Sequence, residues 1–329
     1  MMASNDGLNR REFLGAIAML PARVSSVRSS QGQGTPLSTA QVPIIDTHIH
    51  LFDSARPGGA QWPSPDDPFP GPQSLPPRFR QLAAPFGVVG AVVVEASSLV
   101  EDNQWVLDLA STEPMIVGLV GRIEPGQPEF AKNLEHFHQN RLFLGIRARP
   151  ESIDDLQRLA AAGLTLDVNT LTTPQSPANP TNGVLKAVIR LTDRVPTLRV
   201  VIDHLPRYQP PPERANGYIA DLQELAQRPQ VYVKVSGVLR GDKLADTVRQ
   251  DRLVFQERID QMWSIFGEDR LIFASDFPNS EREGPYAAII SVLRQYFTRK
   301  GVAVAEKVFW RNSSKAYRWI RRDASQPEV

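Results

Sequence analysis

The chain contains no cysteine, no long apolar run and no excess of either charge. The absence of cysteine excludes disulfides, zinc–thiolate sites and a cysteine nucleophile. Lys and Arg number 37 and Asp and Glu number 36, so a formal net charge of +1 provides no global field for nucleic acid or an anionic membrane. No stretch is apolar for long enough to span a membrane. We therefore expect a small-molecule partner, and the oligomeric state is left open.

The chain is long enough to bury a large core. Its 329 residues are 41% hydrophobic and 22% charged, which is typical of a globular protein with one barrel or two smaller domains. The first forty residues differ, because residues 9–15 resemble a twin-arginine export signal followed by a short apolar segment. Residues 1–40 are therefore expected to be an export signal or a disordered tail, and residues 41–329 a single folded domain. A working signal would place the protein in the periplasm; the alternative is the cytoplasm.

Beyond Gln41, short β-branched runs alternate with longer amphipathic segments. The runs predict eight strands, at 42–50, 88–97, 115–123, 143–149, 164–170, 198–205, 231–238 and 271–277. The amphipathic segments predict helices at 77–86, 103–111, 129–139, 152–162, 182–193, 214–227, 255–266, 285–299 and 305–320.

Strict alternation of strand and helix predicts a parallel sheet with right-handed crossovers. Eight such units over about 280 residues match the size of an α/β fold of the (β/α)8 TIM-barrel type. A doubly wound open sheet is the alternative, although no Gly-x-Gly-x-x-Gly turn follows the first strand. The Pro- and Gly-rich connection from 53 to 76 cannot be regular structure, and we expect it to fold over the barrel mouth, with Trp62 as a contact of this lid.

The first expected strand carries a His-x-His pair. Successive side chains of a strand point to opposite faces, so Asp46, His48 and His50 are expected in one column at the strand's C-terminal end. Imidazole is a common ligand of zinc-like ions. In contrast, His136 and His138 lie two residues apart on a helix, where their side chains point in different directions, so we expect surface positions for them.

Two other strand ends supply partners for this pair. The sixth strand ends in Asp203 and His204, of which alternation allows only one to face the barrel interior. The eighth strand ends in Asp276, just before a proline. In a TIM barrel the catalytic residues gather at the C-terminal ends of the strands, so these side chains are expected to meet the histidines of the first strand.

Five segments together resemble the amidohydrolase-related (amidohydrolase 2) family of TIM-barrel, metal-dependent hydrolases, and within it the lactonase-like branch. These segments are Asp46-Thr47-His48-Ile49-His50, Gly145-Ile146-Arg147, Ile202-Asp203-His204, Lys234-Val235-Ser236-Gly237 and Ala274-Ser275-Asp276-Phe277-Pro278. The resemblance covers residues 42–317. It implies hydrolysis, most often of a ring ester, at a centre formed by His48, His50, His204 and Asp276.

The resemblance also bears on the metal. Two-metal relatives carry a bridging lysine after the fourth strand and a histidine after the fifth, where this chain has Arg147 and Asn169. We therefore expect one zinc-like divalent ion, held by three imidazoles and Asp276, or none. With an ion, Asp276 would act as the general base on activated water. Without one, Asp276 remains the base and the histidines polarise the carbonyl directly.

Further polar side chains are expected at the barrel mouth as substrate-binding residues: Glu95, Arg122, Arg147, Asn169 and Lys234. Two arginines and a lysine in one mouth would suit a carboxylate- or hydroxyl-bearing substrate. The alternative is that an arginine simply pairs with Glu95 or Asp167. For the reaction, the alternatives to a lactone hydrolase are a decarboxylase of a small aromatic or unsaturated acid, which would use the same centre, and a catalytically silent binding barrel.

Overall fold

A computed structural model of the protein describes residues 42–58, 71–169, 181–205, 212–239 and 252–329. All of these described residues belong to one compact unit. The expected export segment and Trp62 lie outside the described residues, so the roles assigned to them stay predictions. Within the described chain, no helix has the length and apolar character needed to cross a membrane.

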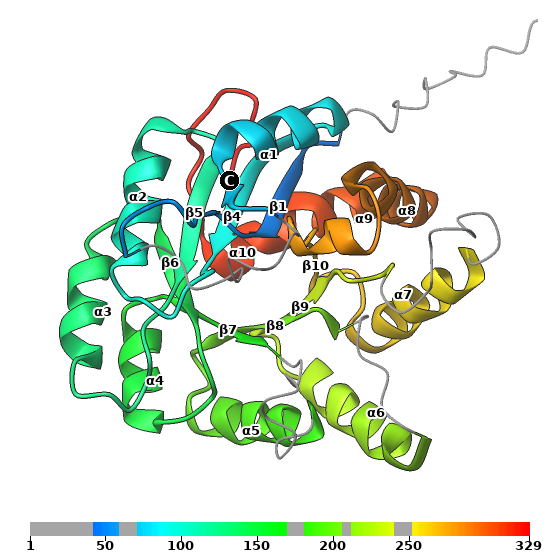
Figure 1. Cartoon of the computed structure of the whole chain (residues 1–329). Helices are drawn as coiled ribbons and strands as arrows, with labels where there is room; N and C mark the ends of the chain where they lie inside the picture. Colours follow the sequence, from blue (N-terminus) through cyan, green and yellow to red (C-terminus); the bar gives the residue numbers. More distant parts are fainter. Residues whose placement is uncertain (1–41, 59–70, 170–180, 206–211, 240–251) are drawn as a thin grey trace, which may run out of the picture. The chain divides into compact units, whose positions relative to one another are not determined.

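Eight parallel strands form one sheet, in the order β1-β4-β5-β6-β7-β8-β9-β10. All eight expected strands are confirmed, with shorter bounds: β1 (Ile44–Ile49), β4 (Val88–Val94), β5 (Ile116–Gly121), β6 (Phe143–Arg147), β7 (Thr165–Asn169), β8 (Arg199–Asp203), β9 (Val231–Val235) and β10 (Leu271–Phe273). Figure 1 shows them as a ring with helices on its outside. The (β/α)8 prediction is therefore confirmed, and the open-sheet alternative is wrong.

The ring closes between its first and last strands. Ile49 pairs with Phe277 in a parallel bridge just beyond the end of β10. The amide of His50 donates to the carbonyl oxygen of Phe277 at 2.7 Å, and the amide of Asp276 donates to the carbonyl oxygen of His48 at 3.0 Å. The backbone bonds that close the barrel are thus made by the residues that carry the expected reaction centre.

Helices follow the strands around the ring (Figure 1). They are α1 (Pro76–Ala83), α2 (Asp102–Thr112), α3 (Phe130–His138), α4 (Ile153–Ala161), α5 (Thr181–Arg194), α6 (Pro212–Ala226), α7 (Arg252–Phe266), α8 (Tyr286–Arg299), α9 (Val302–Glu306) and α10 (Asn312–Tyr317). A π-helical turn, Lys307–Arg311, lies between α9 and α10. The expected helix 305–320 ends early because Arg318 takes the left-handed conformation, with φ of 57°.

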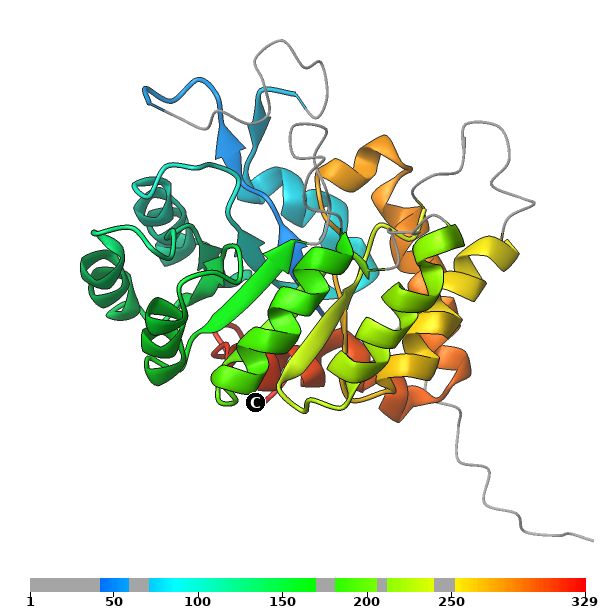
Figure 2. The same cartoon turned by 90° about the horizontal axis from the view of Figure 1, so that it is seen from below.

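The connection after β1 is only partly irregular. Its two ends form a small antiparallel ribbon of β2 (Phe52–Asp53) and β3 (Gln73–Ser74). Figure 2 shows this ribbon apart from the barrel strands. The prediction that the whole connection lacks regular structure is therefore wrong at its ends, where backbone pairing brings Phe52 opposite Ser74.

Buried β-branched side chains explain why these segments form a parallel sheet. Both faces of such a sheet are covered, so its strands consist of nearly continuous apolar residues. In β4 the sequence Val-Val-Gly-Ala-Val-Val-Val is almost entirely buried. Gly145 of β6 is required for a different reason: a Cβ there would lie 2.1 Å from Thr165 Oγ1 and 2.5 Å from the Thr165 carbonyl oxygen. Its absence allows β6 and β7 to approach each other.

Candidate active site

Four side chains from three strand ends converge inside the barrel. His48 and His50 come from the end of β1, His204 follows β8 and Asp276 follows β10. The Nε2 atoms of His48, His50 and His204 lie 3.8, 3.5 and 3.8 Å from Asp276 Oδ1. The two Nε2 atoms of His48 and His50 are 3.2 Å apart. All four residues are buried, so the structure brings together the centre expected from the sequence.

These separations fit the ligands of one divalent ion. Four ligand atoms bound tetrahedrally to zinc at about 2.1 Å lie about 3.3–3.5 Å from one another. The distances among His48 Nε2, His50 Nε2 and Asp276 Oδ1 run from 3.2 to 3.8 Å. Imidazole nitrogens and a carboxylate oxygen are also the donor types that zinc accepts.

The Nδ1 atoms of His50 and His204 each have a further partner. Nδ1 of His50 donates to the carbonyl oxygen of Val94 at 3.0 Å, because a carbonyl can only accept. Nε2 of neutral His50 therefore carries the lone pair that faces the cluster. Nδ1 of His204 lies 2.5 Å from Ser236 Oγ. Such contacts orient a histidine ligand.

The electrostatics favour neutral rings for His48 and His204 and an ionised carboxyl for Asp276. Burial lowers the pKa of His48 well below its ordinary value, and the Lys234 ammonium lowers it further. Burial also lowers the pKa of His204, although Asp276 and Asp203 act in the opposite direction. Burial alone would raise the pKa of Asp276, but His204, His50 and His48 together lower it below its ordinary value. Neutral nitrogens and an ionised carboxylate are the forms that bind a metal ion.

One expectation about the sixth strand end is wrong. Strand alternation allowed only one of Asp203 and His204 to face the interior, yet both reach His48. Asp203 Oδ1 lies 3.5 Å from His48 Nδ1, and the His204 ring centroid lies 4.4 Å from that of His48. The reason is that His204 leaves the strand with φ of 54°, which breaks the alternation.

Lys234 lies deeper than expected for a residue of the mouth. Its side chain has no exposed surface, and Nζ lies 2.6 Å from Asp167 Oδ2 and 3.0 Å from Asp203 Oδ1. Tyr317 of α10 donates to the same Asp167 oxygen at 2.8 Å. This position favours a role in positioning His48 over direct contact with the substrate.

The described residues of this connected cluster include more carboxylates than cations. The carboxylates are Glu95, Asp167, Asp203 and Asp276, and the cations are Arg147 and Lys234. Because burial raises the pKa of Asp167 only to about 6, its carboxyl is also mostly ionised at neutral pH. A divalent cation would balance the excess negative charge.

The remaining expected substrate-binding residues lie in different settings. Arg147 Nε donates to Glu95 Oε1 at 2.8 Å, so the alternative interpretation, an arginine paired with Glu95, applies to this residue. Arg122 forms an ion pair with Glu124, and both are about one-third exposed. Asn169, the last residue of β7, is exposed. His136 and His138 are exposed on α3, as predicted.

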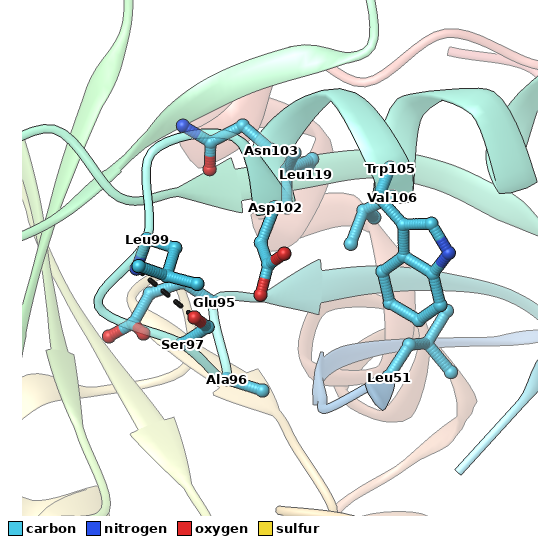
Figure 3. Close-up of a pocket in the computed structure, with 10 residues that line it drawn as sticks. All are labelled: Leu51, Glu95, Ala96, Ser97, Leu99, Asp102, Asn103, Trp105, Val106 and Leu119. Carbon is cyan, nitrogen blue, oxygen red and sulfur yellow. Dashed lines mark hydrogen bonds between the residues drawn. The ribbon is translucent and has the colours of Figure 1, made fainter. Parts of the chain in front are cut away.

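A crevice opens beside the cluster, between the ends of β1, β4 and β5 and the start of α2. It is narrow, with a cavity volume of about 10 Å³, about the space that one water molecule needs. Figure 3 shows Glu95 and Trp105 at opposite ends of this crevice, with the Asp102 carboxylate between them. The crevice adjoins the centre, because Glu95 follows Val94, the acceptor of the His50 ring proton.

Sequence reasoning missed three side chains that complete the centre, namely Asp203 as a partner of His48, Ser236 and Tyr317. Ser236 had a visible signal, because it lies two residues after Lys234 and so shares its strand face. Tyr317 had none, since its contact with Asp167 depends on where the C-terminal helix lies.

The closed (β/α)8 barrel carries a His-x-His pair, a histidine and an aspartate at its strand ends, where the catalytic residues of such barrels lie. The sequence profile of the amidohydrolase family matches residues 45–319, and the chain belongs to this family. It is therefore an enzyme of the amidohydrolase type.

Individual proteins are also similar to the chain. An L-fucono-1,5-lactonase of Burkholderia ambifaria is 29% identical over 301 residues, which cover 86% of this chain and 98% of that protein. An amidohydrolase from Burkholderia multivorans, solved with bound zinc, has a TM-score of 0.70 at 20% identity and covers 84% of this chain and 100% of its own. A 2,6-dihydroxybenzoate decarboxylase has a TM-score of 0.57 at 12% identity over 84% and 99%. The two structures share the fold with this chain.

Proposed function

We propose that the protein opens the ring ester of a sugar-acid lactone, using one divalent ion held by His48, His50, His204 and Asp276. The observation that carries the proposal is the convergence of three Nε2 atoms on one oxygen of Asp276, at 3.5 to 3.8 Å. The lactonase of Burkholderia ambifaria, similar over nearly its whole length, supports the choice of a lactone.

Asp276 is the proton carrier in this mechanism. A bound ion would lower the pKa of water and polarise the ester carbonyl. Because the pKa of Asp276 is below its ordinary value, its carboxylate is ionised at neutral pH and can accept a proton from the attacking water. The same carboxyl then returns the proton to the ring oxygen as the ester C–O bond breaks. Water and lactone thus yield a hydroxy acid.

The groups around the cluster orient the substrate in this mechanism. Glu95 and Arg147 are only 12% and 16% exposed, and Glu95 lines the crevice. Their remaining donor and acceptor positions suit the hydroxyl groups of a sugar ring.

A panel of sugar 1,5-lactones, followed by acid release with and without a chelator, tests the proposal. We expect turnover that a chelator abolishes and zinc restores. Asp276→Asn should lower kcat by about 10³-fold with the fold retained, since a positioned base contributes about 10²–10⁴-fold. Asp193→Asn is the control, because Asp193 is 59% exposed and pairs with Arg228 on the surface.

Three outcomes would change the proposal. Full activity of Asp276→Asn would remove the base from the mechanism. Undiminished turnover after the ion is removed would refute the metal but not the hydrolysis. Release of carbon dioxide from an aromatic acid, without any ring opening in the lactone panel, would identify the decarboxylase instead.

A further inference from the structure

The side chain of Lys234 places a positive charge inside the cluster, next to His48. Its Nζ lies close to two carboxylate oxygens and one imidazole nitrogen. Asp167 Oδ2 lies at 2.6 Å, Asp203 Oδ1 at 3.0 Å and His48 Nδ1 at 3.0 Å. The side chain has no exposed surface, so the amino group lies inside the barrel.

The described residues contain two groups that could each hold an ion, and His48 belongs to both. One is His48, His50 and Asp276, and the other is His48, Asp203 and His204. The first group lies within the set used in the proposed function, which also includes His204. The Lys234 ammonium lies against the second, at 3.0 Å from both His48 Nδ1 and Asp203 Oδ1.

We propose that Lys234 is a built-in cation that occupies the second group and limits the centre to a single metal ion. Two physical effects act together. The ammonium lies against Asp203 Oδ1 and His48 Nδ1, at the place that a second ion would need. It also repels a second cation across a few ångströms of buried, weakly screening protein. The inference takes from the proposed function only the assignment of the first ion to the first group.

Two residues hold the ammonium from the closed end of the barrel. Tyr317 donates to Asp167 Oδ2, the same oxygen that accepts from Lys234, at 2.8 Å. The Tyr317 ring centroid also lies 5.6 Å from Lys234 Nζ, within the range of a cation–π contact. Both partners are buried. Lys234 is therefore a positioning residue whose place is determined by contacts that do not involve substrate.

Lys234→Met tests the inference, because methionine fills similar space without charge or donors. The purified parent and variant are dialysed against zinc and then against metal-free buffer, and zinc per chain is measured by plasma mass spectrometry. We expect the variant to retain one more ion per chain than the parent. Tyr317→Phe is the matched control: it disturbs the same cluster but keeps the ammonium, so we expect the parental number.

Removing Lys234 leaves two buried carboxylates without their cation, so a second variant guards against misfolding. Lys234→Met combined with Asp167→Asn removes one of those charges and keeps His48, Asp203 and His204. Circular dichroism establishes folding, and the same extra ion is expected. A folded variant of either kind that retains no more zinc than the parent overturns the inference. The zinc count is independent of turnover, so failure of the lactone panel leaves this result standing.

Discussion

At the scale of single residues, the cations expected at the mouth already have carboxylate partners. Arg147 bonds to Glu95 through Nε at 2.8 Å and to the Glu95 carbonyl oxygen through Nη2 at 3.0 Å. Burial would lower the pKa of Arg147, but Glu95 and Asp203 raise it above its ordinary value. Arg122 is likewise paired with Glu124. Among the described residues, this pairing favours a hydroxyl-bearing substrate over a carboxylate-bearing one.

Glu95→Gln tests that preference. The variant keeps the shape of the pair but leaves the charge of Arg147 available to substrate. We expect kcat/KM for a carboxylate-bearing lactone to rise about tenfold relative to its neutral analogue, since a charge-assisted hydrogen bond is worth about 1.5–3 kcal/mol. Glu124→Gln is the matched control and should change the ratio little. An unchanged ratio of the two kcat/KM values in Glu95→Gln would show that Arg147 does not contribute to selection of the substrate by its charge.

At the scale of secondary-structure elements, Asp46 ties the first strand to the last strand and its helix. Asp46 Oδ1 accepts from the Ser275 amide at 2.9 Å, and Oδ2 accepts from the Tyr286 hydroxyl of α8 at 2.9 Å. Burial raises the pKa of Asp46 to about 6, against the donors that lower it. Asp46 therefore braces the closure on which His48 and Asp276 depend, whereas the sequence predicted only a shared column with the histidines.

Tyr286→Phe removes one of these donors. We expect the free energy of unfolding to fall by about 1–3 kcal/mol, the cost of leaving a buried acceptor unsatisfied. Because the folded pKa of Asp46 is about 6, above its ordinary 3.8, the carboxyl is protonated in the folded state below pH 6. The loss should therefore be larger at pH 8 than at pH 5, as measured by urea denaturation.

Tyr296→Phe is the control for this prediction. The Tyr296 hydroxyl also bonds to a carboxylate, that of Asp260, but at an exposed position. Its removal should cost less than about 1 kcal/mol, as for most exposed polar contacts. Equal losses in the two variants would contradict a bracing role for Asp46.

At the scale of the whole molecule, an ion on this centre would join residues more than two hundred positions apart. Its ligands come from the first, sixth and eighth strands of the ring, and they meet only when the barrel is closed. Because such an ion binds the folded chain and not the unfolded one, binding adds to stability.

Ion removal should therefore lower Tm. At a thousandfold excess over Kd, a bound ion contributes about 4 kcal/mol, which corresponds to a Tm shift of roughly 8–16 °C. Scanning calorimetry before and after chelation measures the shift. His50→Gln should abolish it, whereas His136→Gln on α3 should keep it, because His136 is an exposed residue far along a helix.

The same centre should hold its ion into mildly acidic solution. The pKa values of His48 and His204 are lowered, so these ligands protonate only below the ordinary histidine value of 6.5. Zinc content after dialysis at a series of pH values should fall with a midpoint below 6.5. A midpoint above 6.5 would contradict neutral, buried ligands.

The sequence by itself determined the barrel and the grouping of four side chains at its strand ends. Alternating strands and helices and a buried parallel sheet are properties of local composition and periodicity, which one chain displays directly. Strand ends of a barrel meet at one mouth, so His48, His50, His204 and Asp276 could be grouped without coordinates.

Only the tertiary structure decided which neighbours these residues have. The left-handed backbone at His204 brings the His204 side chain to His48 beside that of Asp203, against strand alternation. The depth of Lys234, its contact with His48 and the hydroxyl of Tyr317 depend on how strands and the C-terminal helix pack in space. Contacts between residues far apart in the chain are set by that packing, and a pattern read along one strand contains no information about it.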